Sequence, residues 1–206
     1  MSTYNKLRYG VVNFSESRAC FEDALDFKLL DQRCLMLNGP IDDYVSGKLI
    51  RSLQLLSSEP EEITLLISSE GGDVYPGMAI IQAMRKAQRA GCVIVGVVRG
   101  YAMSMACIIL MACDLRYCSE DDVLMIHGAT SMLVGDVRNQ KADTKLTERT
   151  MDIHARFIAE RNTSDNVKYA DIAYWRRMLD DNFPLYFIGQ EALEAGLVDE
   201  IIDSTR

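Results

Sequence analysis

The chain has few histidines and fewer basic than acidic residues, and both features exclude some classes of function. Only two histidines occur among 206 residues, and neither lies near Cys113 or Cys118. That pair of cysteines therefore does not predict a zinc site. The formal net charge of −8 disfavours nonspecific binding to nucleic acid or to an anionic membrane surface. We expect no bound metal, no cofactor, no nucleic-acid partner and no membrane partner.

The sequence also lacks long apolar runs and a disulfide-like pattern of cysteines. Charged residues interrupt the first segment, "MSTYNKLRYGVVNFSESRACFEDALDF", so it does not read as a secretory signal. The apolar run between Arg99 and Asp114 is shorter than the roughly 20 residues of a membrane-spanning helix. The six cysteines lie mostly in apolar segments, which indicates buried, reduced thiols. Together these features predict a soluble, cytoplasmic globular protein.

The first half of the chain alternates between strand-like and helix-like segments. Residues 33–38, 63–68 and 93–98 are short runs of aliphatic residues, typical of strands buried on both faces of a parallel sheet. Between them we expect two helices, one capped by Ser46 and one that runs from Pro76 to Gly91. This order predicts an α/β fold with right-handed crossovers.

The second half begins with a long charged helix. From Asp136 to Arg161 the apolar residues recur at helical spacing, at Ala142, Leu146, Ile153 and Phe157. This stripe packs either on the chain's own core or, as a projecting arm, on another subunit; the pattern alone does not decide between the two.

Two further helices and a final strand follow the charged helix. Thr163 or Ser164 offers a cap for the next helix. The segment "QEALEAGLVDEII" predicts a short helix, a stop at Gly196 and a last strand.

Three features converge at the carboxyl ends of the expected strands, where α/β sheets bind ligands. Gly71 and Gly72 form a turn after one strand, Ser104 stands where the next strand passes into an apolar helix, and His127 ends the strand "VLMIH". Taken singly, each has an ordinary interpretation: a tight turn, a capping serine, a structural histidine. On adjacent strand ends, however, the serine and the histidine predict a nucleophile beside a general base.

These residues lie in stretches that resemble the proteolytic subunit of the Clp protease, the ClpP family, along nearly the whole chain. The matching stretches are "LNGPIDD", "LLISSEGGDVYPGMAII", "GYAMSMACIILMA", "VLMIH", "DIHARFI" and "EALEAGLVDEI". The resemblance implies an α/β fold of the ClpP/crotonase-like type, built from repeated ββα units with a protruding handle helix. It implies one domain over residues 1–206, in which about 1–30 form the axial loop and first helix and about 128–162 form the handle.

The resemblance also implies the roles of the site residues. Ser104 matches the nucleophile and His127 the base, while the backbone amides of Gly72 and Met105 match the oxyanion hole. His154, within "DIHARFI", matches a handle position and is expected to be structural. The segment "TSMLVGDV" after the base would form the strand that pairs with an extended substrate.

The acidic member of the triad is the least determined residue. Aligning "DNF" with the family pattern makes Asp181 the acid, with Asp180 as the fallback. Aligning "YF" instead places Leu185 there and leaves no acid. We favour Asp181.

The resemblance implies a serine endopeptidase that degrades unfolded polypeptides inside two stacked seven-membered rings. No P-loop pattern occurs, so a partner AAA+ unfoldase of the Clp type would have to hydrolyse ATP. A ring subunit of the same shape with impaired catalysis is the alternative, because of the uncertain acid. A crotonase-type acyl-CoA enzyme is a third candidate, but it would not need both Ser104 and His127.

Overall fold

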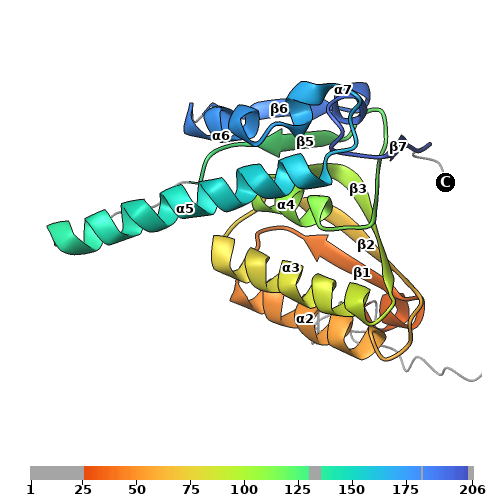
Figure 1. Ribbon diagram of the computed structural model, residues 1–206. Coiled ribbons are helices and arrows are strands. Elements are labelled where there is room, and N and C mark those ends of the chain that lie inside the picture. The colour runs from red at the N-terminus through yellow and green to blue at the C-terminus, as the bar shows by residue number, and fades with distance from the viewer. Residues whose placement is uncertain (1–25, 130–135, 182, 204–206) are drawn as a thin grey trace, which may run out of the picture.

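A computed structural model describes residues 26–129, 136–181 and 183–203 (Figure 1). Residues 26–31 are helical. The expected axial loop lies almost entirely outside the described residues. So does most of the segment "TSMLVGDV", which was expected to bind substrate.

The core of the fold is a parallel sheet formed by the predicted aliphatic strands. β1 (Cys34–Asn38), β2 (Glu62–Ser69) and β3 (Val93–Met103) pair in parallel and in that order. The sheet continues through β4 (Leu115–Cys118) to β7 (Glu200–Ile201), also in parallel. The α/β class and the three predicted strands are therefore confirmed, and β3 runs beyond Val98 to Met103.

β3 is long enough to pair with two different strands, and this double pairing positions the site. Its first part pairs with β4, with Val97 opposite Tyr117. Its last part pairs in parallel with β5 (Val123–Ile126), with Met103 opposite Met125. β6 (Leu185–Ile188) then adds to β5 in antiparallel register. Ser104, directly after β3, is thus brought beside the end of β5.

Two helices cover β1 and β2 and lie side by side in Figure 1: α2 (Asp43–Leu56) and α3 (Val74–Arg89). The expected Ser46 cap is wrong. The side chain of Asp42 caps α2 by accepting from the amide of Val45 at 2.8 Å. Ser46 is buried inside the helix and donates to the carbonyl oxygen of Pro76 at 3.1 Å. Likewise α3 begins ahead of Pro76, which the first turn of a helix tolerates because its missing N–H has no partner there anyway.

The apolar run after Ser104 forms α4 (Met105–Met111), all of whose residues are buried. Gly77 of α3 makes room for it, because a Cβ at that glycine would lie 2.4 Å from Cγ of Met105. Burial raises the pKa of the Cys107 and Cys113 thiols to about 12, so both stay protonated at neutral pH. The expectation of buried, reduced thiols holds for these two residues.

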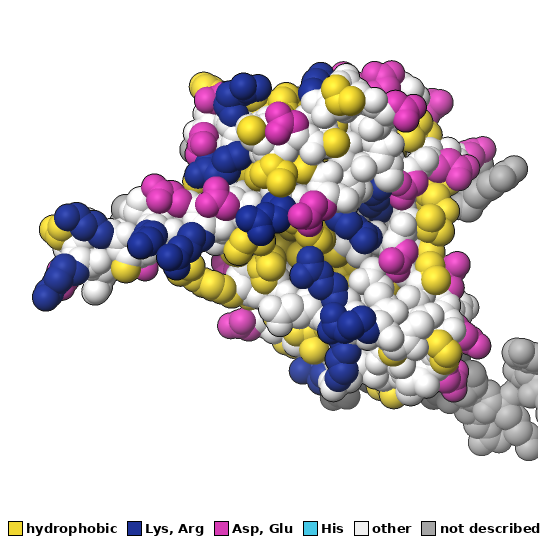
Figure 2. Space-filling model, in the orientation of Figure 1, with side chains coloured by type: hydrophobic (Ala, Val, Ile, Leu, Met, Phe, Trp, Pro, Cys, Tyr) yellow, Lys and Arg dark blue, Asp and Glu magenta, His cyan; other side chains and the backbone are white. Residues whose placement is uncertain are grey.

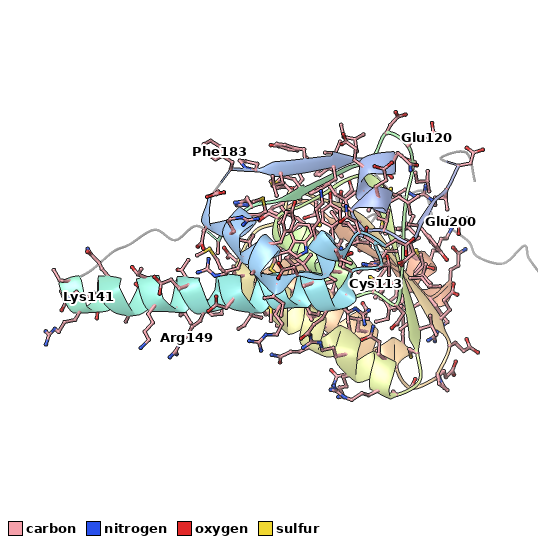
Figure 3. All side chains as sticks on the ribbon, turned by 45° about the horizontal axis from the view of Figure 1, so that its top comes forward. Cys113, Glu120, Lys141, Arg149, Phe183 and Glu200 are labelled. Atoms are coloured by element: carbon pink, nitrogen blue, oxygen red, sulfur yellow. The ribbon has the colours of Figure 1, made fainter. Side chains whose placement is uncertain are left out.

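The long charged helix is α5 (Val137–Arg161), which projects from the rest of the chain (Figure 1). Its buried residues all lie near its C-terminal end: His154, Ala155, Ile158 and Ala159. Along the projecting part, Lys141 and Arg149 point away from the core (Figure 3). Leu146 and Ile153 of the apolar stripe are 43% and 51% exposed. The described residues thus leave much of the stripe uncovered, which favours the interpretation as an intersubunit arm.

The C-terminal part contains η1 (Val167–Ala170), α6 (Ile172–Asp180) and α7 (Gln190–Glu194). Asn166 and Asp171 cap the first two, so the expected caps at Thr163 or Ser164 are wrong. The stop at Gly196 is confirmed by its φ of +68° after α7. None of the helices in the described ranges is long and apolar enough to cross a membrane.

Candidate active site

Ser104 and His127 meet at the shared carboxyl edge of β3 and β5. The amide of Ser104 donates to the carbonyl oxygen of Met125 at 2.7 Å, which fixes the serine against the neighbouring strand. The hydroxyl oxygen of Ser104 then lies 2.8 Å from Nε2 of His127. This is the separation required for a base that removes the serine proton. Two strand ends that the sequence placed on one edge thus bring these side chains into direct contact.

The backbone at Ser104 adopts a conformation that is rare for a residue with a side chain. Its φ is +53° and its ψ is −123°, at the junction between β3 and α4. A nucleophile elbow uses the same device, a strained strand-to-helix turn that exposes the hydroxyl above the sheet. The buried α4 on one side and β5 on the other hold the turn in place.

The Gly71–Gly72 turn lies directly against Ser104. A Cβ at Gly71 would be 2.8 Å from Cβ of Ser104 and 3.0 Å from the amide nitrogen of Met105. A Cβ at Gly72 would lie 2.4 Å from the carbonyl oxygen of Ile41. Both positions also have positive φ, so glycine is required at each for space and for conformation.

The amides of Gly72 and Met105 are the two donors that the family resemblance implies for an oxyanion hole. Neither donates a hydrogen bond to a partner in the described part of the chain. Both residues line the cavity beside Ser104. Met105 is held by its side chain, which is buried against Gly77. In acyl-transfer enzymes, backbone N–H groups beside the reacting residue stabilise the tetrahedral intermediate.

Replacement of Gly71 by alanine is expected to lower activity at the site by about 100-fold or more. The new methyl group would collide with backbone and with Ser104, and displacing a reacting group by about 1 Å costs on that order. Gly100→Ala is the matched control, because Gly100 has a similar φ of +90° but open space around a Cβ. Hydrolysis rates of the two variants test this. Equal losses of activity would show that backbone strain alone, rather than contact with Ser104, explains why glycine is needed at position 71.

A small cavity of about 60 Å³ opens beside the serine and the histidine. Apart from Ser104 and His127 its lining is mostly apolar, with one further polar residue. The lining consists of Gly72, Val74, Ser104, Met105, Ile108, Ile126, His127, Ala129 and His154. The cavity is therefore large enough only for a small group beside the serine hydroxyl.

His154 reaches this cavity from α5, although the sequence indicated only a structural role. Its side chain is 6% exposed, and its Nε2 has no hydrogen-bond partner among the described residues. Burial lowers the pKa of His154 to about 4, so the ring is neutral at physiological pH. The stretch "DIHARFI" marks His154 only as a handle position, and nothing in the sequence indicates that its ring borders the cavity.

Burial of neutral His154 predicts a loss of stability in acid. The imidazole has a pKa near 6.5 when unfolded and about 4 when folded, so between these values only the unfolded state binds the proton. The free energy of unfolding should thus fall by up to about 3 kcal/mol as the pH drops from 6.5 to 4. Urea unfolding of the wild-type protein and of His154→Gln at pH 7 and pH 4.5 measures this. An equal loss in both proteins would contradict the prediction.

No hydrogen bond joins the predicted acid to His127 among the residues that the structure describes. Asp181 is exposed at the C-terminal end of α6, and within the described part of the chain the one hydrogen bond of His127 is with Ser104. Asp180 forms an ion pair with Arg176. Leu185 opens β6 opposite Ile126, so the connection from Asp181 runs toward the strand end that carries His127. The role of Asp181 stays a prediction.

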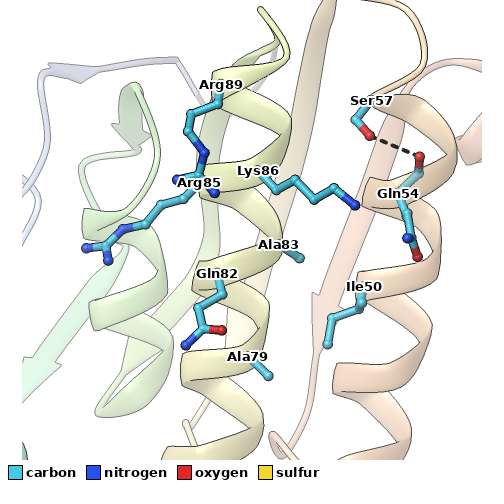
Figure 4. Close-up of a pocket in the computed structure, with 9 residues that line it drawn as sticks. All are labelled: Ile50, Gln54, Ser57, Ala79, Gln82, Ala83, Arg85, Lys86 and Arg89. Atoms are coloured by element: carbon cyan, nitrogen blue, oxygen red, sulfur yellow. Dashed lines mark hydrogen bonds between the residues drawn. The ribbon is translucent and has the colours of Figure 1, made fainter.

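A wider groove between α2 and α3 has different chemistry (Figure 4). It has a volume of about 620 Å³ and is lined by Ile50, Gln54, Ser57, Ala79, Gln82, Ala83, Arg85, Lys86 and Arg89. The hydroxyl of Ser57 already donates to the carbonyl oxygen of Gln54 at 3.0 Å, and no histidine is part of this lining. The groove thus lacks a serine–histidine pair, unlike the cavity at Ser104.

Comparison with known proteins assigns the family. Residues 20–205 match the family described as Clp protease, and the chain belongs to that family. It is similar to the ATP-dependent Clp protease proteolytic subunit 2 of Nocardia farcinica, with 31% identity over 96% of this chain and 94% of that protein. It is also 28% identical to the ATP-dependent Clp protease proteolytic subunit of Deinococcus radiodurans, over 87% of this chain and 84% of that protein. The recognition made from the sequence is confirmed.

Proposed function

We propose that the chain is a serine endopeptidase that degrades unfolded polypeptides inside a barrel of two stacked seven-membered rings, fed by a partner AAA+ unfoldase of the Clp type. The observation that carries the proposal is the 2.8 Å contact between Ser104 and His127, beside two backbone amides that donate to no acceptor among the described residues. Family membership supports the same reaction, because the relatives are named as proteolytic subunits of ATP-dependent proteases.

The proposed reaction follows from this geometry. His127 removes the proton of the Ser104 hydroxyl as its oxygen attacks a peptide carbonyl. The negative charge that develops on the carbonyl oxygen is stabilised by the amides of Gly72 and Met105. His127 then gives the proton to the departing amine, and an acyl-serine remains. Water, deprotonated by His127, hydrolyses that ester and restores the hydroxyl.

The assembly is supported by surfaces that one chain leaves exposed. Leu146 and Ile153 lie on the projecting α5, and Val137 at its start is 65% exposed. Lys and Arg side chains gather along the same projecting part (Figure 2). A second ring that packs on α5 would cover its apolar side chains and enclose the site.

Hydrolysis of one protein in two states tests the enclosed chamber. A permanently unfolded, alkylated protein and its native form are incubated with the sized assembly. We expect the unfolded form alone to be cut, and the native form only after addition of the unfoldase and ATP. Cleavage by a monomeric fraction, or equal cleavage of both forms without ATP, would contradict the enclosed chamber.

Asp181 is proposed as the acid that orients His127, and its replacement tests the triad. Loss of such an acid lowers kcat by about 10⁴-fold, because the imidazole is no longer held in the required tautomer. We expect Asp181→Asn to show a loss of about that size, measured as kcat for a fluorogenic peptide. Asp180→Asn is the matched control and should retain activity, since Asp180 pairs with Arg176. If neither change matters, the site works without an acid.

The alternative is a ring subunit with impaired catalysis. One observation favours it, namely that no described carboxylate is hydrogen-bonded to His127. The two candidates differ in the activity of the pure assembled protein. A large assembly that hydrolyses no peptide, with or without the unfoldase, would select the impaired subunit.

A further inference from the structure

Asp122 is a buried acidic residue that the proposed reaction does not use. It lies directly before β5 and is 5% exposed. Within the described ranges it forms no salt bridge, and both of its side-chain oxygens accept from backbone amides. Oδ1 accepts from Gly100 at 2.6 Å, and Oδ2 accepts from Ser119 at 2.7 Å. Burial of a carboxylate without a cation is costly unless such hydrogen bonds compensate, so these two contacts need an explanation.

The contact with Gly100 falls where β3 departs from a regular strand. The register between β2 and β3 shifts there, so that residues 99–101 of β3 stand where β2 has only Ser68. The backbone at Gly100 has a positive φ of +90°. Bulges of this kind bend a strand, and they often lie beside active sites, where they redirect a side chain. The carboxylate of Asp122 thus binds the backbone at the bend of the strand that leads to Ser104.

The same contact stands at one end of the pairing between β3 and β5. After the bulge, the last three residues of β3, 101–103, pair with β5. The amide of Ser104 continues this pairing, because it donates to the carbonyl oxygen of Met125 at 2.7 Å. The hydrogen bond from Gly100 to Asp122 therefore closes the beginning of the paired segment, and the Ser104 amide closes its end.

We propose that Asp122 is a positioning residue, which holds the bulge of β3 against the start of β5 and thereby keeps the hydroxyl of Ser104 beside Nε2 of His127. Ser104 follows β3 and His127 follows β5, so a shift between the two strands moves the hydroxyl relative to the ring. Displacement of a reacting group by about 1 Å costs about 100-fold in rate. The inference rests on the proposed peptidase function and adds to it a residue outside the lining of the cavity.

Replacement of Asp122 in the assembled, full-length protein tests this role. We expect Asp122→Ala to lower kcat for a fluorogenic peptide about 100-fold and to leave KM nearly unchanged, because Asp122 does not line the cavity. Asp114→Ala is the matched control. Its carboxylate also accepts from an amide of β3, that of Ile94 at 2.8 Å, but at the opposite end of the strand. Both variants should lose stability, whereas only Asp122→Ala should lose kcat, measured per assembled chain.

A conservative variant provides the second contrast. Asp122→Asn keeps an oxygen that can accept from Gly100, but a neutral acceptor binds the amide more weakly, so kcat should fall only about tenfold. If Asp122→Ala does not assemble, Asp122→Asn compared with Asp114→Asn gives the same comparison.

Three results would overturn the inference while leaving the peptidase function standing. The first is wild-type kcat in the Asp122 variants that assemble, and the second is an equal loss of kcat in the Asp114 variants. The third is failure of every Asp122 variant to assemble, which would make Asp122 a residue needed for folding alone. No hydrolysis of any peptide by the assembled wild-type protein would overturn both the inference and the peptidase function.

Discussion

Ser104→Ala is expected to lower peptide hydrolysis by about 10⁵–10⁶-fold while leaving the fold and the assembly unchanged. The alanine keeps the backbone of the elbow but removes the oxygen that lies 2.8 Å from His127. His127→Ala should cost a similar factor, and the double variant little more, because the two residues act as one unit. The measurement is kcat/KM for a fluorogenic peptide together with the assembly's mass.

Ser57→Ala is the matched control for the loss of a serine hydroxyl. Ser57 lies in the groove between α2 and α3, where its hydroxyl donates to the carbonyl oxygen of Gln54 in its own helix (Figure 4). This variant should hydrolyse the peptide at the wild-type rate. Activity that survives in Ser104→Ala would exclude Ser104 as the nucleophile.

Asp199→Ala is expected to destabilise the protein by about 3–5 kcal/mol, because it leaves a buried charge unpaired. The Arg116 side chain is 3% exposed, and its guanidinium lies 2.5 Å from Oδ1 of Asp199. The same carboxylate accepts from the amide of Arg116 at 2.8 Å and so joins β4 to the segment before β7. Urea unfolding measures the change in the free energy of unfolding.

Asp152→Ala provides the comparison with an exposed ion pair. Asp152 binds Arg176 at 2.6 Å, but its side chain is 58% exposed. Exposed pairs contribute only about 0–1 kcal/mol. A loss in Asp199→Ala no larger than that in Asp152→Ala would show that Arg116 is solvated after the change and does not remain buried.

The sequence was sufficient to predict the central strands and the serine–histidine pair. Buried parallel strands are short aliphatic runs, and their carboxyl ends lie at one edge whatever the exact register. That rule alone predicts that Ser104 and His127 lie close together. The splitting of β3 between β4 and β5 could not be foreseen, because strand pairing depends on contacts between distant segments.

The wrong or missing predictions have local physical causes. Asp and Ser are both common N-cap residue types, and the sequence did not show that the hydroxyl of Ser46 would instead donate to the carbonyl oxygen of Pro76. β4 was missed because Arg116 interrupts its apolar pattern, and only the fold supplies the partner at Asp199. His154 was expected to have only a structural role, because a helical sequence does not show which of its buried residues borders a cavity.

Covalent labelling of the assembled protein tests the central claim most directly. A fluorophosphonate reacts with a serine that a neighbouring base activates, and mass spectrometry of the digested protein locates the adduct. The account predicts one adduct per chain, on Ser104, formed at a strongly reduced rate in His127→Ala. An adduct on another residue, an equal rate in the variant, or no adduct at all would contradict the assignment of Ser104 and His127 as nucleophile and base.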